Sequence, residues 1–269
     1  MIVTLLTDFG LSDTYAGVMK GVILARAPEV NVVDLTHDVP PQAVDEAAFL
    51  LDGAWRYFPE GSVHVAVVDP GVGTSRRRLA IFSGGHYFVG PDNGVLSAAI
   101  PEAIRGFRRP GEGYDARTIS LPAGIAAVNI ESQMILTQMI SATFEGRDVF
   151  APAAAHLAKG GSLSDLGPPV PELLTFPAFR ALRVGNRIEG VVLRGDRFGN
   201  LITDIAAVDL PPSPVFTVAG RSLHLAASYA AADGPATIVG SSGLIEIAMP
   251  NGSAAVVLGA GAGDRVVAA

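Results

Sequence analysis

Three apolar runs separated by helix-like segments constrain the fold of the first half of the chain. The runs "MIVTLLTDF" (1–9), "NVVDLTH" (31–37) and "SVHVAVVD" (62–69) are rich in residues that favour strands. The spacing of apolar residues predicts a helix within 12–30, which has Ser12 as N-cap and stops before Pro28, and a second helix over 43–58. Strands this apolar are usually covered on both faces, so the pattern predicts an α/β unit around a parallel or mixed central sheet.

The second half of the chain has a different pattern. A Gly84-Gly85 hairpin and an alanine-rich helix over 149–161 are the last elements of the α/β kind. After a proline-rich connector, five or six short strand-like runs separated by turns predict a small all-β barrel. We therefore expect an α/β N-terminal domain over 1–172, a linker over 173–184 and a β-barrel C-terminal domain over 185–269.

Charge and composition narrow the classes of partner. The formal net charge of -7 argues against binding of nucleic acid or an anionic membrane, and it suits a small neutral or cationic molecule. The chain has no cysteine, which excludes disulfides and thiolate metal sites and suits a reducing cytosol. Its most apolar internal window, 123–140, contains Asn129, Glu131, Gln133 and Gln138, which would be costly in lipid. These features predict a soluble cytoplasmic protein.

Four aspartates at strand ends or turns are candidate site residues: Asp8, Asp69, Asp92 and Asp196. Ligands of open α/β sheets bind beyond the carboxyl ends of the strands, so Asp8 and Asp69 are expected to face the same place. Any one of the four could equally be an aspartate that caps a turn.

The stretch "DPGVGTSRRR" (69–78) joins Asp69 to three arginines. Two glycines between Asp69 and Arg76 allow the loop to fold back, so we expect these two side chains to pair, and the guanidinium to lower the pKa of Asp69. Arg77 and Arg78 are expected to form a solvated face.

The five histidines do not have the spacing of a metal site. They are His37, His64, His86, His156 and His224, and we interpret them as structural. We therefore expect no metal.

Seven motifs in order along the chain resemble one enzyme family. They are "TDFG", "THDVPP" (36–41), "VVDPGVGT", "GPDNG", "TFEGRDVFAPAAA", "GDRFGNLIT" and "SSGLIEIA". Together they resemble the S-adenosyl-L-methionine (SAM) hydroxide adenosyltransferases, also called SAM hydrolases, which are related to the SAM-dependent fluorinase and chlorinase. The resemblance covers nearly the whole chain. It implies an α/β domain followed by a β-barrel, SAM as substrate without a separate cofactor, and a homotrimer with each site between two subunits.

The resemblance also implies roles for individual residues. Asp69 and Arg76 match two members of an Asp-Arg-His set that positions the attacking water, and Asp8 matches the residue that binds the ribose hydroxyls. The expected substrate-binding residues are Asp8, Phe9, Asp13, Asn93, Asp196, Phe198, Asn200, Ser241, Ser242, Glu246 and Met249. The halogenases have tyrosine and threonine where this chain has Asp69 and Val72, which favours water over halide as the nucleophile.

The chain departs from the family pattern at the third catalytic position. The family motif reads "TFHGRD", whereas this chain has Glu145 in place of the histidine. A carboxylate there can pair with Arg76, and as a second negative charge it would raise the pKa of one carboxyl group of the pair with Asp69. Alternatively, Glu145 turns outward and the enzyme is slow.

Two further departures concern the segment 113–142 and Pro250. The segment is longer than in the family and is a lid, a subunit contact or a core helix. Pro250 stands in "AMPNGSA", where it removes a backbone donor near the expected adenine site.

The sequence thus predicts hydrolysis of SAM to adenosine and L-methionine, with Asp69, Arg76 and Glu145 around the water. The alternatives are a SAM-dependent halogenase and a protein that binds SAM or adenosine without turnover.

Overall fold

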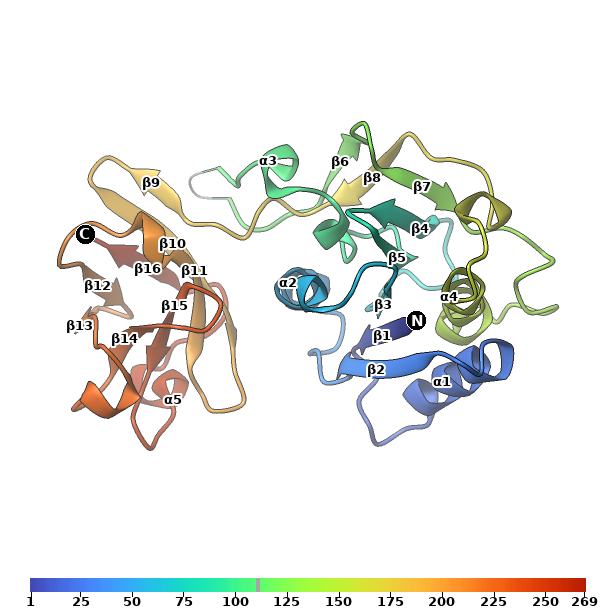
Figure 1. Cartoon of the computed structure of the whole chain (residues 1–269). Coiled ribbons are helices and arrows are strands. Elements are labelled where there is room, and N and C mark those ends of the chain that lie inside the picture. Colours follow the sequence, from blue (N-terminus) through green and yellow to red (C-terminus); the bar gives the residue numbers. More distant parts are fainter. Residues whose placement is uncertain (110–111) are drawn as a thin grey trace. The chain divides into compact units, whose positions relative to one another are not determined.

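The computed structural model describes residues 1–109 and 112–269, which form two compact units (Figure 1). The first unit comprises Met1–Gly106 and Tyr114–Pro177, and the second comprises Phe107–Gly113 and Ala178–Ala269. The domain limits at 172 and 185 stay a prediction. The stretch expected as linker contains most of strand β8 (Glu172–Thr175) and all of β9 (Leu182–Val184).

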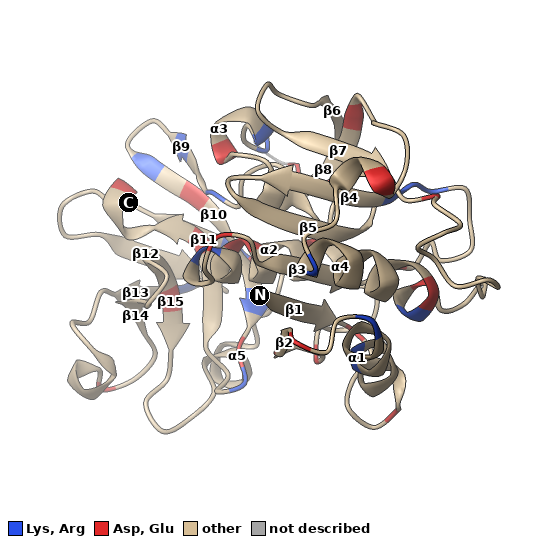
Figure 2. Ribbon diagram, turned by 45° about the vertical axis from the view of Figure 1, so that its right-hand side comes forward, with Lys and Arg blue, Asp and Glu red and all other residues tan. Residues whose placement is uncertain are grey.

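A mixed sheet forms the centre of the first unit, as predicted. Its strands, in spatial order, are β2 (Asn31–Thr36), β1 (Ile2–Thr7), β3 (Val63–Val67), β5 (His86–Pro91), β4 (Arg78–Ser83) and β7 (Ala126–Asn129). The first four are parallel, and β4 is antiparallel to both of its neighbours. Strands β1, β3 and β5 contain no Lys, Arg, Asp or Glu, because helices or loops cover both of their faces (Figure 2).

Helices cover the two faces of this sheet. Helices α1 (Tyr15–Arg26) and α4 (Ala151–Ala158) share one core with Leu5, whereas α2 (Val44–Ala54) shares the other with Leu6. The two leucines are adjacent, so alternation along β1 sends them to opposite faces. Helix α1 begins at Tyr15 without a side-chain cap, so the prediction of Ser12 as N-cap was wrong by two positions. No helix in the described residues is long and apolar enough to cross a bilayer.

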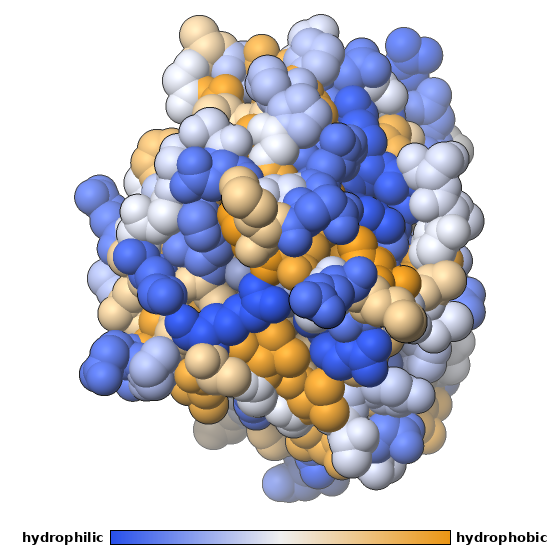
Figure 3. All heavy atoms as spheres, turned by 90° about the vertical axis from the view of Figure 1, so that its right-hand side faces the viewer, coloured by the Kyte–Doolittle hydropathy of each residue, from blue (hydrophilic) through white to orange (hydrophobic). Residues whose placement is uncertain are grey.

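The segment 113–142, all of which is described, contains two strands and no helix. Strand β6 (Arg117–Ser120) pairs with β8, and β7 lies at the edge of the central sheet. The core-helix interpretation of this segment was therefore wrong. After β7 the chain runs through turns in which Met134 and Met139 are 93% and 84% exposed. The end of the unit that carries this segment shows apolar groups interspersed with polar ones (Figure 3).

The second unit is a nearly closed antiparallel barrel, which confirms the predicted class. Its spatial order is β13 (Arg221–His224), β12 (Val215–Val218), β16 (Arg265–Ala268), β10 (Arg187–Gly195), β11 (Leu201–Ala206), β15 (Leu244–Ala248) and β14 (Ala236–Val239), with β9 paired to β10. A single bridge between Leu225 and Thr237 links the two ends of this order. Ile188, Phe216 and Ile247 belong to the barrel core, and helix α5 (Ala254–Leu258) packs against it through Leu258.

A buried histidine pair lies within the central sheet. The Nδ1 of His64 on β3 lies 2.9 Å from the Thr4 hydroxyl, and its Nε2 lies 3.1 Å from Nδ1 of His86. Burial, together with the nearby His86, lowers the pKa of His64 to about 4. The folded protein therefore holds His64 neutral at pH values where an unfolded chain would protonate it.

We expect this histidine to make folding stability depend on pH. Because its folded pKa of about 4 is below the unfolded value of 6.5, protons favour the unfolded chain, and stability falls as pH drops through that window. The loss amounts to at most about 3 kcal/mol. Urea unfolding of the wild type and of His64→Gln at pH 7.5 and pH 4.5 measures it. The two proteins should differ in their pH dependence, and equal losses would contradict the assignment.

Candidate active site

Two aspartates leave the central sheet at the same edge. Strands β1 and β3 are parallel neighbours with Thr7 opposite Val67, so the chain leaves both strands on one side. Asp8 follows the first strand and Asp69 follows the second, and both line one cavity of about 340 Å³. The prediction that these two aspartates face the same place is confirmed.

The wall of this cavity comes from four loops of the first unit. Its residues are Asp8, Phe9, Pro41, Gln42, Val67, Asp69, Pro70, Val72, Thr143, Phe144, Glu145 and Gly146. The rings of Phe9 and Phe144 lie 6.0 Å apart, edge to face. Oδ2 of Asp8 accepts a hydrogen bond of 2.9 Å from the backbone N–H of Gln42, whose φ is +68°. A left-handed glutamine is strained, and such strain is characteristic of functional sites.

Asp69 and Arg76 pair as predicted. The Nε of Arg76 donates to Oδ1 of Asp69 at 2.8 Å, and its Nη2 donates to Oδ2, so the contact is bidentate. The loop between them depends on Gly73, whose φ is +78° and where a Cβ would lie 2.4 Å from the Ala142 carbonyl oxygen. A side chain at position 73 would therefore push this loop away from the segment that leads to Glu145.

The expectation that Asp69 has a lowered pKa was wrong, whereas the expected raising effect of Glu145 on this pair is confirmed. Burial is the largest effect and raises the pKa, the hydrogen bond and charge of Arg76 lower it, and the charge of Glu145 raises it again. The net effect is a raised pKa, because the aspartate is taken out of water as well as paired. Asp69 is thus a stronger base than an ordinary surface aspartate.

Glu145 points inward. It immediately precedes a π-helical turn over Gly146–Phe150 that runs into α4, and its side chain is 1% exposed. Its Oε2 accepts from Nη2 of Arg76. The outward interpretation of Glu145 was therefore wrong, and the expected pairing of Glu145 with Arg76 is confirmed.

The other two arginines of the run are not a solvated face, which corrects the prediction. Arg78 donates to Oε1 of Glu145 from Nε at 2.9 Å and from Nη2 at 2.6 Å. Arg77 pairs with the buried Asp92 at 2.7 Å, and Asp92 also accepts from the backbone N–H of Leu174. All three arginines are therefore bound to buried carboxylates.

Two other expected residues of the first unit do not line this cavity. Asp13 lies in the exposed turn before α1. Asn93 donates to the Val68 carbonyl at 2.9 Å and accepts from the Val95 N–H at 3.1 Å, so its amide supports the end of β3. Their roles in binding stay predictions.

The second unit has a cavity of its own, of about 770 Å³. It is lined by Phe198, Asn200, Tyr229, Ala230, Met249, Pro250, Asn251 and Gly252. Of the expected binding residues, Phe198, Asn200 and Met249 contribute to this wall. Pro250, the departure from the family pattern, also lies in it.

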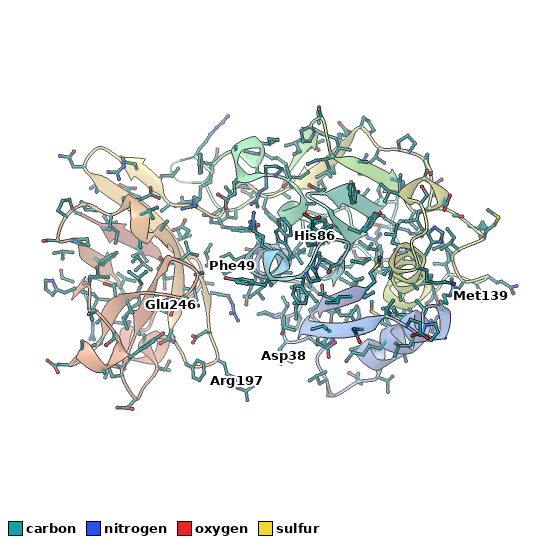
Figure 4. The ribbon with its side chains drawn as sticks, viewed as in Figure 1. Asp38, Phe49, His86, Met139, Arg197 and Glu246 are labelled. Atoms are coloured by element: carbon teal, nitrogen blue, oxygen red, sulfur yellow. The ribbon has the colours of Figure 1, made fainter. Side chains whose placement is uncertain are left out.

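The remaining expected residues of the barrel support or flank that wall. Asp196 accepts from the backbone N–H groups of Phe198 and Asn200 and from the Asn200 amide at 2.8–2.9 Å, so it shapes the turn between β10 and β11. Glu246, labelled in Figure 4, lies on β15. It accepts a hydrogen bond from the Tyr229 hydroxyl at 3.0 Å. Ser241 and Ser242 are exposed in the turn before β15.

Sequence reasoning missed Tyr229, Gln42, Phe144 and Arg78. Gln42 and Phe144 are next to or within quoted motifs, so their neighbours could have pointed to them. Tyr229 lies in a stretch, "SYAAADG", without any motif. Burial, its bond to Glu246 and the charge of Asp196 raise the pKa of Tyr229, so its hydroxyl stays protonated.

We expect Glu145→Ala to destabilise the protein. It would leave Arg76 in a low-dielectric site with one partner fewer and Arg78 without its carboxylate, at a cost of about 3 kcal/mol. Urea unfolding measures the loss. Lys20→Met, which breaks the exposed pair of Lys20 with Asp34, is the control and should cost less than about 1 kcal/mol. Equal losses in free energy of unfolding would show that the buried cluster stabilises the protein no more than an exposed ion pair does.

Two domain models of one family match the two halves of the chain. The model of the SAM hydroxide adenosyltransferase N-terminal domain matches residues 3–167, and that of the C-terminal domain matches residues 190–267. A protein of Thermus thermophilus named (R)-S-adenosyl-L-methionine hydrolase is 41% identical over 258 residues, which cover 94% of each chain. A protein of Actinoplanes named fluorinase is 27% identical over 236 residues, which cover 78% of this chain and 73% of that one.

A solved structure is similar to this chain over its whole length. The crystal structure of an uncharacterized conserved protein from Thermotoga maritima aligns over 100% of both chains, with a TM-score of 0.83 and 31% identity. Together with the two matched domains, this similarity leads to one conclusion: the chain belongs to the SAM hydroxide adenosyltransferase family.

Proposed function

We propose that this protein hydrolyses SAM to adenosine and L-methionine, with water attacking C5′ of the ribose opposite the sulfonium. The observation that supports it is the buried cluster of Asp69, Arg76 and Glu145 on the wall of the first cavity. Members of the family that are 32–41% identical to this chain are named (R)-S-adenosyl-L-methionine hydrolase. The (R) configuration at sulfur is therefore the substrate form that we propose.

The chemistry of the substrate reduces what the protein must supply. The sulfonium is already an excellent leaving group, so methionine departs without an acid. The protein must still align the two reactants. Holding water and C5′ in line can lower the barrier by up to about 7–11 kcal/mol. The positive charge on sulfur disappears as the bond to oxygen forms, so a cavity that excludes bulk water favours the reaction.

Asp69 is the group that we propose to accept a hydrogen bond from the water and then its proton. Its raised pKa brings its basicity closer to that needed at neutral pH. Arg76 holds both carboxylate oxygens and so limits rotation of the side chain. In the proposed complex, Asp8 binds the ribose hydroxyls, and the barrel cavity at Phe198, Asn200 and Met249 receives the adenine.

Water is favoured over halide as the nucleophile by two wall residues. Asp69 and Val72 both line the cavity, at the positions where the halogenases carry tyrosine and threonine. A carboxylate at that place repels a halide ion and orients water. The lower identity to the fluorinase, 27%, agrees with this assignment.

Incubation with each sulfonium diastereomer of SAM, followed by chromatography, tests the function. We expect adenosine and methionine, with the (R) form as the better substrate, and a loss of kcat of at least about a hundredfold in Asp69→Asn. Asp45→Asn, on the exposed side of α2, should retain activity. A 5′-halo-5′-deoxyadenosine formed in the presence of chloride or fluoride would establish a halogenase instead. Tight binding measured by calorimetry without any product would establish a binding protein.

We further propose that the protein is a homotrimer in which each active site takes its first-cavity residues from one subunit and its barrel residues from the next. The family resemblance implies this arrangement. The presence of a separate cavity on each unit supports it, since a head-to-tail ring would supply both to every site.

Mixing two inactive subunits tests the shared site. Asp69→Asn removes the proposed base, and Met249→Trp fills the barrel cavity. Co-expressed with different tags and purified through both, the mixed trimers should regain roughly a third of the sites, because each mixed ring has one interface of three at which both halves are intact. The mass in solution should be three times 27.7 kDa. Absence of any recovery in confirmed mixed trimers would show that each site belongs to one chain.

A further inference from the structure

Arg78 is close to the proposed catalytic cluster, although it does not line the cavity. It begins strand β4, and its backbone N–H donates to Oδ1 of Asn129 on β7 at 3.0 Å. Its guanidinium directs Nε and Nη2 to the same oxygen of Glu145. The sheet thus fixes the backbone of Arg78, and Glu145 fixes its side chain.

The four charged side chains form a line of alternating sign. Asp69 binds Arg76, Arg76 binds Glu145, and Glu145 binds Arg78. Asp69, Arg76 and Glu145 are at most 10% exposed, whereas Arg78 is 28% exposed. With Arg78 the line is neutral, and without it two buried carboxylates would share one guanidinium.

The geometry points to Arg78 as a positioning residue: by binding Glu145, it keeps Arg76 available to hold Asp69 in place. This inference rests on the proposed function of Asp69 as the base. Arg78 acts through Glu145, because the side chains whose charges act on Asp69 are Arg76 and Glu145. Position 145 therefore needs its carboxylate and position 78 its positive charge as a pair.

Neighbouring charges do not replace Arg78. Arg147 follows Glu145 closely in the chain, but both Nε and Nη2 of Arg147 donate to Asp148. Two further charges near the cluster are those of Glu131, which the Asn129 amide binds, and of Asp8 in the cavity wall. These additional groups are acidic or already paired. Removal of Arg78 would therefore leave the cluster with excess negative charge.

The inference is tested by introducing Arg78→Met into the wild type and into Glu145→Gln, with kcat measured as a function of pH. Without Arg78, the charge of Glu145 is uncompensated and raises the pKa of Asp69. The acid limb of the profile should then move to higher pH, and kcat should fall by about tenfold to a hundredfold as Asp69 loses its alignment. In Glu145→Gln, the same substitution should change kcat by less than about twofold, because nothing remains for Arg78 to compensate.

The chain offers a matched control for the loss of an arginine. Arg77→Met removes the adjacent guanidinium, whose partner is Asp92 and not Glu145. Its acid limb should coincide with that of the wild type. Arg78→Lys retains the charge and should restore most of the rate lost in Arg78→Met. If Arg78→Met does not fold, Arg78→Gln provides the neutral variant.

A titration without substrate separates this inference from the proposed function. Aspartate labelled with ¹³C at the carboxyl carbon, with Asp69→Asn to assign the signal, reports the pKa of Asp69 directly by NMR. That pKa should rise in Arg78→Met and should not rise in the double variant with Glu145→Gln. If the wild type forms no adenosine, the proposed function fails. The titration still shows whether Arg78 acts on Asp69 through Glu145. Equal shifts in both backgrounds, or no shift in either, would overturn the inference.

Discussion

The guanidinium of Arg76 is the group on which the candidate site depends. It joins two carboxylates, Asp69 and Glu145, that come from distant parts of the chain and are both buried. Removing a carboxylate from water costs several kcal/mol, and only a well-placed positive charge offsets that cost. The turn at Gly73 and the π-helical turn after Glu145 are the local features that bring the three groups together.

The three consecutive arginines serve different partners. Arg76 and Arg78 both bind Glu145, whereas Arg77 binds Asp92. The same run thus stabilises the cavity wall on one side and the turn after β5 on the other. A change at Arg77 acts on Asp92, whereas changes at Arg76 and Arg78 both act on Glu145, although the three residues look equivalent in the sequence.

Much of the fold could be predicted because apolar pattern and turn chemistry are local. The runs at 1–9, 31–37 and 62–69 became parallel strands, and the short runs after 185 became a barrel. The N-cap of α1 was missed because Ser12 is a good capping residue by type, whereas the helix begins at Tyr15 after Thr14, which makes no side-chain cap hydrogen bond. Tyr229 was missed because its contact with Glu246 joins two segments without a shared motif.

The sequence by itself determined the order of elements, the positions of Asp8 and Asp69 beyond parallel strands, and the pairing of Asp69 with Arg76 across a short glycine loop. Only the tertiary structure decided the state of that pair. Burial, which depends on every element packed around the loop, raises the pKa of Asp69 where pairing alone would lower it. The tertiary structure also decided that Glu145 faces inward between Arg76 and Arg78, because Glu145 lies 67 positions after Arg78 and no local pattern encodes that contact.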